Sequence, residues 1–315
     1  MASPLILLIA GFVVLGLAGE ALLRGAVTLA DKLRVSPLII GLTIIAFGTS
    51  APELTVSLNA ALNGQPDISI GNVVGSNIAN ILLVMGAMAV VSPFFVNHGT
   101  LARDGGFMIG VSALLFVLGM VGIIDRPAGI ALFVILIGFT YYLYTSAREV
   151  EDTAEALAGV HENRVPGGAL VAGMVLLVGI AGIIWGAELM VDGAVALARQ
   201  WGISEAVIAL SLVAIGTSLP ELAVSLVAAM RGHAGLAVGN IIGSNISNIL
   251  LILGVTSMAA PLPISDMMAM RDIPIMIGVA CLGFIFMASG RAMSRLEGGI
   301  SLALYAAYMG FIFSA

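Results

Sequence analysis

The 315-residue sequence has few charged residues and almost no cysteine. Asp, Glu, Lys and Arg together make up 10% of the chain, whereas hydrophobic residues make up 60% and the mean hydropathy is +1.14. A soluble protein of this length needs a far more charged surface. Cys281 is the only cysteine, which excludes an internal disulfide and any cysteine-based metal site. The net charge of −6 provides no basic face, so we expect no nucleic-acid partner.

Apolar segments long enough to cross a bilayer recur along the whole chain. A bilayer core takes about 20 apolar residues per helix. The first segment lacks a basic start, and its apolar run is longer than the apolar core of a typical signal peptide, so we expect it to be a membrane span. The sequence thus predicts an all-α polytopic membrane protein that is embedded in the lipid bilayer. Its ten predicted spans are 4–29, 36–62, 68–91, 104–124, 127–147, 168–197, 204–230, 236–260, 272–289 and 297–313.

The two halves of the chain are copies of each other. Residues 48–80 align with 216–248 without a gap, and 19 of these 33 positions are identical. A unit of five spans ends on the side opposite to where it began, so its second copy must be inverted. We therefore expect two inverted-topology five-helix repeats, 1–147 and 168–315, joined by an acidic cytoplasmic linker at 148–167.

The distribution of basic residues predicts the orientation in the plasma membrane. Cytoplasmic loops of membrane proteins carry an excess of Lys and Arg. With the N-terminus outside, eight basic residues fall in cytoplasmic loops and three in outer loops. We therefore expect a multi-pass protein with both termini outside. The eight are Lys32, Arg34, Arg103, Arg148, Arg164, Arg231, Arg291 and Arg295, and the three are Arg126, Arg199 and Arg271.

Each half carries a proline and a glutamate in the middle of a predicted span, within "GTSAPE" and "GTSLPE". Pro52 and Pro220 each remove a backbone donor, so we expect broken core helices whose freed carbonyls face a cavity. A proline that merely kinks its helix is the alternative. Glu53 and Glu221 follow the breaks and have no Lys or Arg at the same depth. An unpaired, duplicated carboxylate within a membrane indicates a functional site.

Two such glutamates carry a charge of −2 when both are ionised. One divalent cation, two sodium ions or two protons neutralise that charge, and this competition is a physical basis for exchange. The remaining candidate ligands are oxygen donors, as calcium prefers. They are Thr49, Ser50, Ser76, Asn80, Thr217, Ser218, Ser244 and Asn248. His98, His161 and His233 fall in predicted loops, which argues against a transition metal.

Other polar residues have less specific interpretations. Asn72, Asn77, Asn240 and Asn245 are interpreted as caps of broken helices. Glu20 and Arg24 are predicted to form an i,i+4 ion pair. Glu188 and Asp192 are interpreted as interfacial, with an ion access path as the alternative.

At "GTSAPELTVS…GNVVGSNIAN" and "GTSLPELAVS…GNIIGSNISN" the sequence resembles the sodium/calcium exchanger branch of the calcium/cation antiporter superfamily. The resemblance covers nearly the whole chain and implies a prokaryotic-type member, since the linker is too short for a calcium-sensing domain. It implies that spans 2, 3, 7 and 8 form the ion-binding core, across which spans 1 and 6 slide. Asparagine at Asn248, where potassium-dependent relatives have aspartate, argues against potassium coupling.

The same resemblance implies a role for each candidate ligand. Calcium would be bound by Glu53 and Glu221 with the backbone oxygens of Thr49 and Thr217. Sodium would be bound by four serines and two carbonyls, and two asparagines would complete the central ring. These are Ser50, Ser76, Ser218 and Ser244, the carbonyls of Ala46 and Ala214, and Asn80 with Asn248.

The sequence therefore predicts an antiporter that exchanges sodium for calcium, and no enzyme. A proton/calcium antiporter that uses the same two glutamates remains the alternative. A channel would need no counter-ion, and inverted repeats favour a transporter over it. A serine hydrolase would need a histidine or lysine at membrane depth to activate Ser50 or Ser218. We expect no cofactor and no obligate protein partner.

Overall fold

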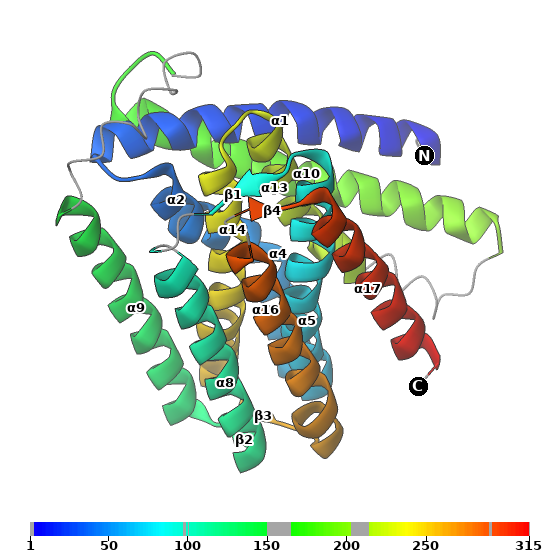
Figure 1. The fold of residues 1–315 in the computed structure, drawn as a ribbon. Helices are drawn as coiled ribbons and strands as arrows, with labels where there is room; N and C mark the ends of the chain where they lie inside the picture. The colour runs from blue at the N-terminus through cyan, green and yellow to red at the C-terminus, as the bar shows by residue number, and fades with distance from the viewer. Residues whose placement is uncertain are drawn as a thin grey trace.

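The computed structural model describes residues 3–96, 99, 101–149, 165–202, 214–289 and 292–314 as a bundle of helices (Figure 1). The first half comprises α1 (Pro4–Leu33), α2 (Pro37–Ile40), η1 (Gly41–Ile45), α3 (Ala46–Thr49), α4 (Ala51–Leu62), α5 (Pro66–Ala79), η2 (Asn80–Met85), α6 (Gly86–Val91), β1 (Phe94–Phe95), η3 (Leu101–Gly105), α8 (Gly106–Val121), β2 (Ile123–Ile124) and α9 (Arg126–Glu149). The second half comprises α10 (Ala169–Gln200), α12 (Ala214–Thr217), α13 (Leu219–Met230), α14 (Ala234–Ser247), η7 (Asn248–Leu253), α15 (Gly254–Ala259), β3 (Leu262–Pro263), η8 (Met268–Asp272), α16 (Ile273–Ala288), β4 (Ala292–Met293) and α17 (Arg295–Ser314). The η segments are π-helical turns.

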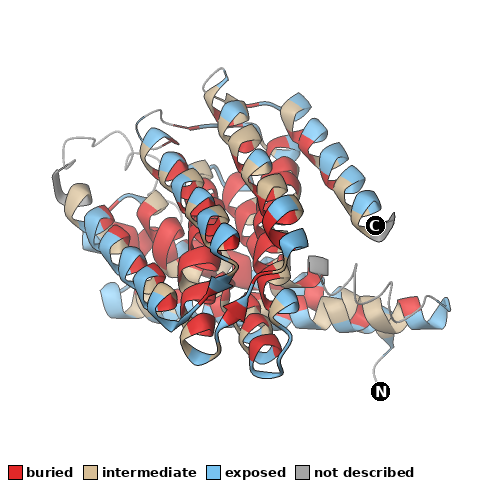
Figure 2. Cartoon of the chain, turned by 90° about the horizontal axis from the view of Figure 1, so that it is seen from below, coloured by how far each residue is buried: buried red, intermediate tan, exposed pale blue. Residues whose placement is uncertain are grey.

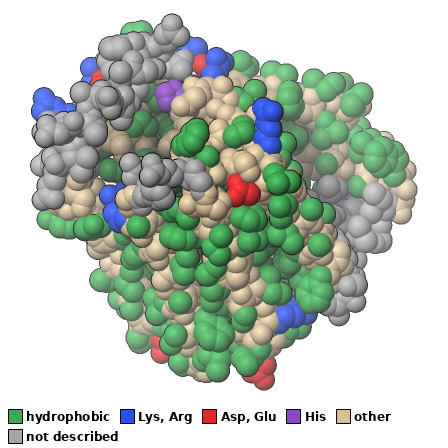
Figure 3. Space-filling model, viewed as in Figure 1, with side chains coloured by type: hydrophobic (Ala, Val, Ile, Leu, Met, Phe, Trp, Pro, Cys, Tyr) green, Lys and Arg blue, Asp and Glu red, His purple; other side chains and the backbone are tan. Residues whose placement is uncertain are grey.

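The helical class and the membrane setting are confirmed. Within the described residues, seven helices are long and apolar enough to cross a bilayer, and the bent pair 37–49 with 51–62 makes an eighth. The predicted span 204–230 falls partly on 203–213, which lie outside the described residues. The span predicted at 297–313 falls on α17, which is not among those eight. Hydrophobic side chains cover a broad band of the surface between charged groups near its upper and lower parts (Figure 3).

Within the described residues, the strands are four two-residue segments that connect loops at opposite ends of the bundle. β1 pairs with β4 and β2 pairs with β3, both antiparallel. In Figure 1 the first pair lies near the top of the bundle and the second near the bottom. Because α8 runs from β1 to β2 and α16 runs from β3 to β4, these two helices run in opposite directions. The residues of α8 and those 168 positions later in α16 therefore cross the bundle in opposite directions.

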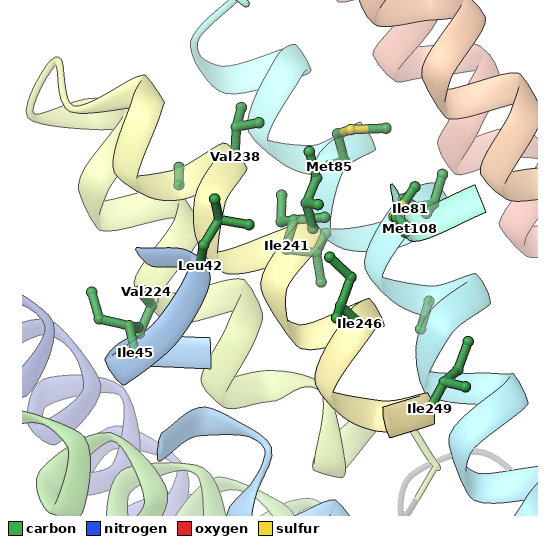
Figure 4. Close-up of a cluster of buried hydrophobic side chains, with 14 of the residues drawn as sticks. Leu42, Ile45, Ile81, Met85, Met108, Val224, Val238, Ile241, Ile246 and Ile249 are labelled. Carbon is green, nitrogen blue, oxygen red and sulfur yellow. The ribbon is translucent and has the colours of Figure 1, made fainter. Parts of the chain in front are cut away.

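The helices α5 and α14, with the π-helical turns that follow them, form the centre of the bundle. In the most apolar window of the helix from 234 to 259, 94% of residues are buried, against 28% in α1 and 33% in α10. Figure 2 shows the same contrast between a buried centre and exposed outer faces. The central contacts are aliphatic, and Figure 4 shows Leu42, Ile241 and Ile246 among them.

The polypeptide breaks near the centre of two spans, beside the prolines. α3 ends at Thr49 and α4 begins at Ala51, with a bend of 44° between the two parts. Ser50 has a ψ of 7°, far from the helical value. In the second half, Ser218 has a ψ of 0° between α12 and α13. Each proline lacks the N–H that would bond to the carbonyl four residues earlier, which explains a break at this point.

The helices α1 and α10 lie side by side and antiparallel across the rest of the bundle (Figure 1). Glycines allow their backbones to touch. A Cβ atom added to Gly25 would lie 2.5 Å from the backbone nitrogen of Leu176, and one added to Gly179 would lie 2.5 Å from that of Leu22. The two helices therefore pack as one unit, with most of the outer surface of each exposed.

We expect Gly25→Val to separate α1 from α10 and to lower the free energy of unfolding by about 1–3 kcal/mol, the usual cost of overpacking. Gly16→Val is the matched control, because Gly16 lies exposed on the same helix with no atom within 4 Å of an added Cβ. Thermal unfolding of the purified protein in detergent measures both. Equal midpoints for the two variants would contradict the backbone contact.

Candidate cation site

Two glutamates lie at the helix breaks, in the interior of the bundle. Glu53 is in the first turn of α4 and Glu221 is in the first turn of α13. Each is only 1% exposed. The N-terminal end of a helix carries a partial positive charge, which stabilises an ionised carboxylate there. The two side chains are close enough to repel each other electrostatically.

Hydroxyl groups from both halves surround Glu221. Ser50 Oγ and Ser244 Oγ donate to Glu221 Oε1 at 3.5 Å and 3.4 Å. Thr49 Oγ1 donates to Asn240 Oδ1 at 3.3 Å and lies 3.5 Å from Ser244 Oγ. All four distances are at the long end for hydrogen bonds, so these contacts hold the groups in place only weakly. The site is therefore assembled from residues about 170–195 positions apart in the sequence.

Five oxygen atoms of the predicted ligands are buried without any hydrogen-bond partner among the described residues. Leaving a buried polar atom unsatisfied costs about 1–3 kcal/mol. Electron-rich oxygens in this condition suit a ligand that accepts lone pairs, which is a cation. The five atoms are Glu53 Oε2, Glu221 Oε2, Asn80 Oδ1, Asn248 Oδ1 and Ser218 Oγ.

Within the part of the chain that the structure describes, no Lys or Arg forms an ion pair with Glu53 or Glu221. Two adjacent carboxylates in a low-dielectric interior cannot both stay ionised without a compensating charge. The described residues also contain no group of three or more His, Cys, Asp or Glu side chains placed to hold a metal. The site thus has two carboxylates and otherwise neutral oxygens, a set that suits hard cations such as calcium and sodium.

The other predicted ligands occupy less distinctive positions. Ser76 is buried on α5, four residues before Asn80 and therefore on the same helix face. The Ala46 carbonyl accepts the backbone N–H of Ser50 at 3.1 Å. The Thr49 hydroxyl, whose one proton also faces Asn240 Oδ1, lies 3.4 Å from the same carbonyl.

In the second half, Thr217 ends α12 and Ala214 begins it. The side chain of Ala214 lies outside the described residues.

Asparagines connect the helices around the site instead of capping helix ends. Asn72 Nδ2 donates to the carbonyl oxygen of Glu53 at 3.1 Å and to Ser57 Oγ at 2.9 Å. The equivalent Asn240 Nδ2 donates to Ser225 Oγ at 3.2 Å. The interpretation of these asparagines as caps is therefore wrong, because a neighbouring helix offers better acceptors. Sequence reasoning missed the paired serines, although they share the 168-residue offset.

The charged residues that the sequence singled out outside the site form ion pairs or are exposed. Arg24 Nε lies 2.9 Å from Glu20 Oε1, as predicted, and Arg231 Nη2 lies 2.9 Å from Glu20 Oε2. Glu188 and Asp192 are exposed on α10.

Of the three histidines, only His233 belongs to the described residues. His98 and His161 lie outside the described residues, and His233 precedes α14 in a loop.

Comparison with known proteins gives consistent matches over the whole chain. A family model described as sodium/calcium exchanger protein matches residues 3–145 and 171–314. The chain is 39% identical to the putative antiporter CaxA of Alkalimonas amylolytica, with 98% of each chain covered. It is 34% identical to the sodium/calcium exchanger MaX1 of Methanosarcina acetivorans, again over 98% of each. The structure resembles that of the sodium-calcium exchanger NCX_Mj soaked with 10 mM Na⁺, with a TM-score of 0.83, 31% identity and 98% of both chains covered.

We expect calcium to raise the thermal unfolding temperature of the purified protein and a chelator to reverse the shift. A ligand at 100 times its Kd stabilises the folded state by about 2.7 kcal/mol. Glu53→Gln removes one negative charge at nearly constant shape, so it should abolish most of the calcium-dependent shift. Glu188→Gln makes the same chemical change on an exposed helix face and should keep it. A full shift in Glu53→Gln would place the calcium elsewhere.

Proposed function

The chain belongs to the sodium/calcium exchanger protein family, and we propose that it is a secondary active antiporter that exchanges sodium for calcium by alternating access. The family consists of ion antiporters, which are transporters and not enzymes. The observation that carries the proposal is the burial of five oxygens of the predicted ligands, those of Glu53 and Glu221 among them, without a hydrogen-bond partner among the described residues.

Charge neutrality provides the coupling in this proposal. The empty site carries two negative charges in the interior of the bundle, which makes its passage across the membrane unfavourable. One calcium ion or two sodium ions neutralise both carboxylates. Only loaded states then change their access from one side of the membrane to the other, so the two ions must be exchanged.

We assign the ligands by position and by the chemistry of each group. Glu53 and Glu221 bind calcium together with the backbone oxygens of Thr49 and Thr217. The unpartnered oxygens of Asn80 and Asn248 complete the central ring. Sodium is bound by serine hydroxyls and by backbone carbonyl oxygens beside the helix breaks. These groups are Ser50, Ser76, Ser218 and Ser244, with the carbonyls of Ala46 and Ala214.

The architecture in this proposal is ten spans in two inverted five-helix repeats, 1–147 and 168–315. The opposite directions of α8 and α16 support an inverted relation. The two segments of the family match, 3–145 and 171–314, support the same division.

We further propose that the protein lies in the plasma membrane with both termini outside. The linker at 148–167 is then cytoplasmic, in keeping with the positions of the basic residues.

The coupling ion is tested by calcium-45 uptake into proteoliposomes. We expect an outward sodium gradient, with sodium trapped inside, to drive uptake at constant pH. A pH gradient without sodium should drive none. Uptake that responds only to the pH gradient would replace sodium with protons as the counter-ion and would remove the sodium roles of Ser50, Ser76, Ser218 and Ser244.

The role of the carboxylates is tested by the same transport assay. We expect Glu53→Gln and Glu221→Gln each to lower sodium-driven uptake by at least about 100-fold, since each leaves a single charge to hold a divalent ion. Glu188→Gln should transport normally. Each variant is first shown to be monodisperse, so that lost transport is separated from lost folding. Full calcium flux in either site variant would overturn the mechanism.

A further inference from the structure

Two buried methionines lie against the asparagines at the centre of the bundle. Asn245 Nδ2 lies 3.4 Å from Met108 Sδ, and Asn77 Nδ2 lies 3.6 Å from Met276 Sδ. Met108 is 1% exposed and Met276 is 2% exposed. Both contacts follow the 168-residue offset, so the same arrangement occurs once in each half. Figure 4 shows Met108 in the buried cluster that includes Ile81 and Ile246.

A thioether sulfur accepts hydrogen bonds and cannot donate them. It therefore determines which end of the neighbouring asparagine amide faces it: the NH₂ group, not the oxygen. Asn245 consequently presents Oδ1 on its other side, where Asn80 Nδ2 donates to it at 3.3 Å. In the other half, Asn77 Oδ1 accepts from Asn248 Nδ2 at 2.9 Å. Each of these two series of contacts thus links a methionine, through one asparagine, to an asparagine that is a predicted ligand.

The orientation of the last amide in each chain matters for a cation. Asn80 and Asn248 each donate their NH₂ group to the neighbouring asparagine, and each leaves a buried Oδ1 without a partner. The oxygen and the NH₂ group of an amide are nearly equal in size, so reversing the amide costs little in packing. Reversal would nevertheless turn a donor toward the cation. Something outside the asparagines must therefore fix the direction.

We propose that Met108 and Met276 are positioning residues that orient Asn80 and Asn248 with their oxygens toward the transported cation. The proposal rests on the proposed function, because it takes these two oxygens as cation ligands. An aliphatic side chain would fill the same space equally well, as the surrounding isoleucines do. The sulfur adds only its ability to accept a hydrogen bond.

The two methionines differ in how much the orientation of the neighbouring asparagine amide depends on them. Asn77 Nδ2 also donates to the backbone oxygen of Asn245 at 3.3 Å, so this amide keeps its direction without the sulfur. Among the described residues, Met108 is the only acceptor for Asn245 Nδ2. Replacing Met108 should therefore affect cation binding more than replacing Met276.

The test compares half-saturating calcium concentrations in sodium-driven uptake and in the calcium-dependent thermal shift. Met108→Leu keeps the side-chain volume nearly constant. It should raise both constants about threefold, the size expected for one lost neutral hydrogen bond, with the maximal rate unchanged. Met276→Leu should raise them less. Met287→Leu is the matched control, because Met287 is fully buried on α16 and none of the described hydrogen bonds reaches its sulfur.

A second background separates positioning from packing. Asn80→Asp replaces the amide by a carboxylate with two oxygens, so no direction remains to be fixed. Adding Met108→Leu to Asn80→Asp should therefore leave the calcium constants of that variant unchanged. A threefold rise in this background as well, or a rise equal to that of Met287→Leu in the wild-type background, would make Met108 a packing residue only.

Failure of the proposed function gives a different result. If the wild-type protein neither binds nor transports calcium, the proposed function falls and this inference falls with it. If the wild-type protein does both and Met108→Leu changes neither constant, only the role of Met108 is overturned.

Discussion

The central constraint in this molecule is the placement of two carboxylates in the interior of an apolar bundle without a basic partner among the described residues. Ionised carboxylates at such a place need a compensating charge. The fold supplies none of its own, apart from the partial charges of two helix N-termini and a few hydroxyl donors. A site of this kind is stable only when it is occupied, by cations or by protons. The requirement for an occupant is what makes the site suitable for transport.

The duplication explains why this constraint can be met at all. Neither half could close the site by itself, because Ser50 from the first half reaches Glu221 in the second and Asn248 from the second half reaches Asn77 in the first. In the inverted arrangement that we propose, the two copies would place equivalent breaks at the same depth. A single glutamate would bind a monovalent ion, whereas the pair carries the charge of a divalent one.

The sequence was sufficient to predict the helix breaks, the interior position of the two glutamates and the helical membrane class, because each depends on local chemistry. Proline removes a backbone donor, and a charged residue stands out within an apolar segment. The asparagine contacts could not be predicted in the same way. Asn245 contacts Met108, which lies 137 positions away in the sequence, and the orientation of the Asn245 amide depends on which neighbour accepts the hydrogen bond from Nδ2. Nor could the sequence show that the Ala46 carbonyl accepts the backbone N–H of Ser50, because the hydrogen bonds at a helix break depend on the local backbone angles.

The difference in burial between the outer pair of helices and the central ones bears on how access to the site could change. α1 and α10 touch each other through backbone atoms at glycines, whereas most of their remaining surface is exposed. The central helices α5 and α14 are more buried than the outer pair and carry candidate ligands. Motion of the outer pair as one unit would leave the ligand geometry unchanged, while motion of a central helix would pull apart bonds such as that between Asn248 and Asn77. If the chain is the antiporter that we propose, an empty site is costly and a distorted one binds poorly, so motion of the outer pair past a rigid core is the change of access that we expect.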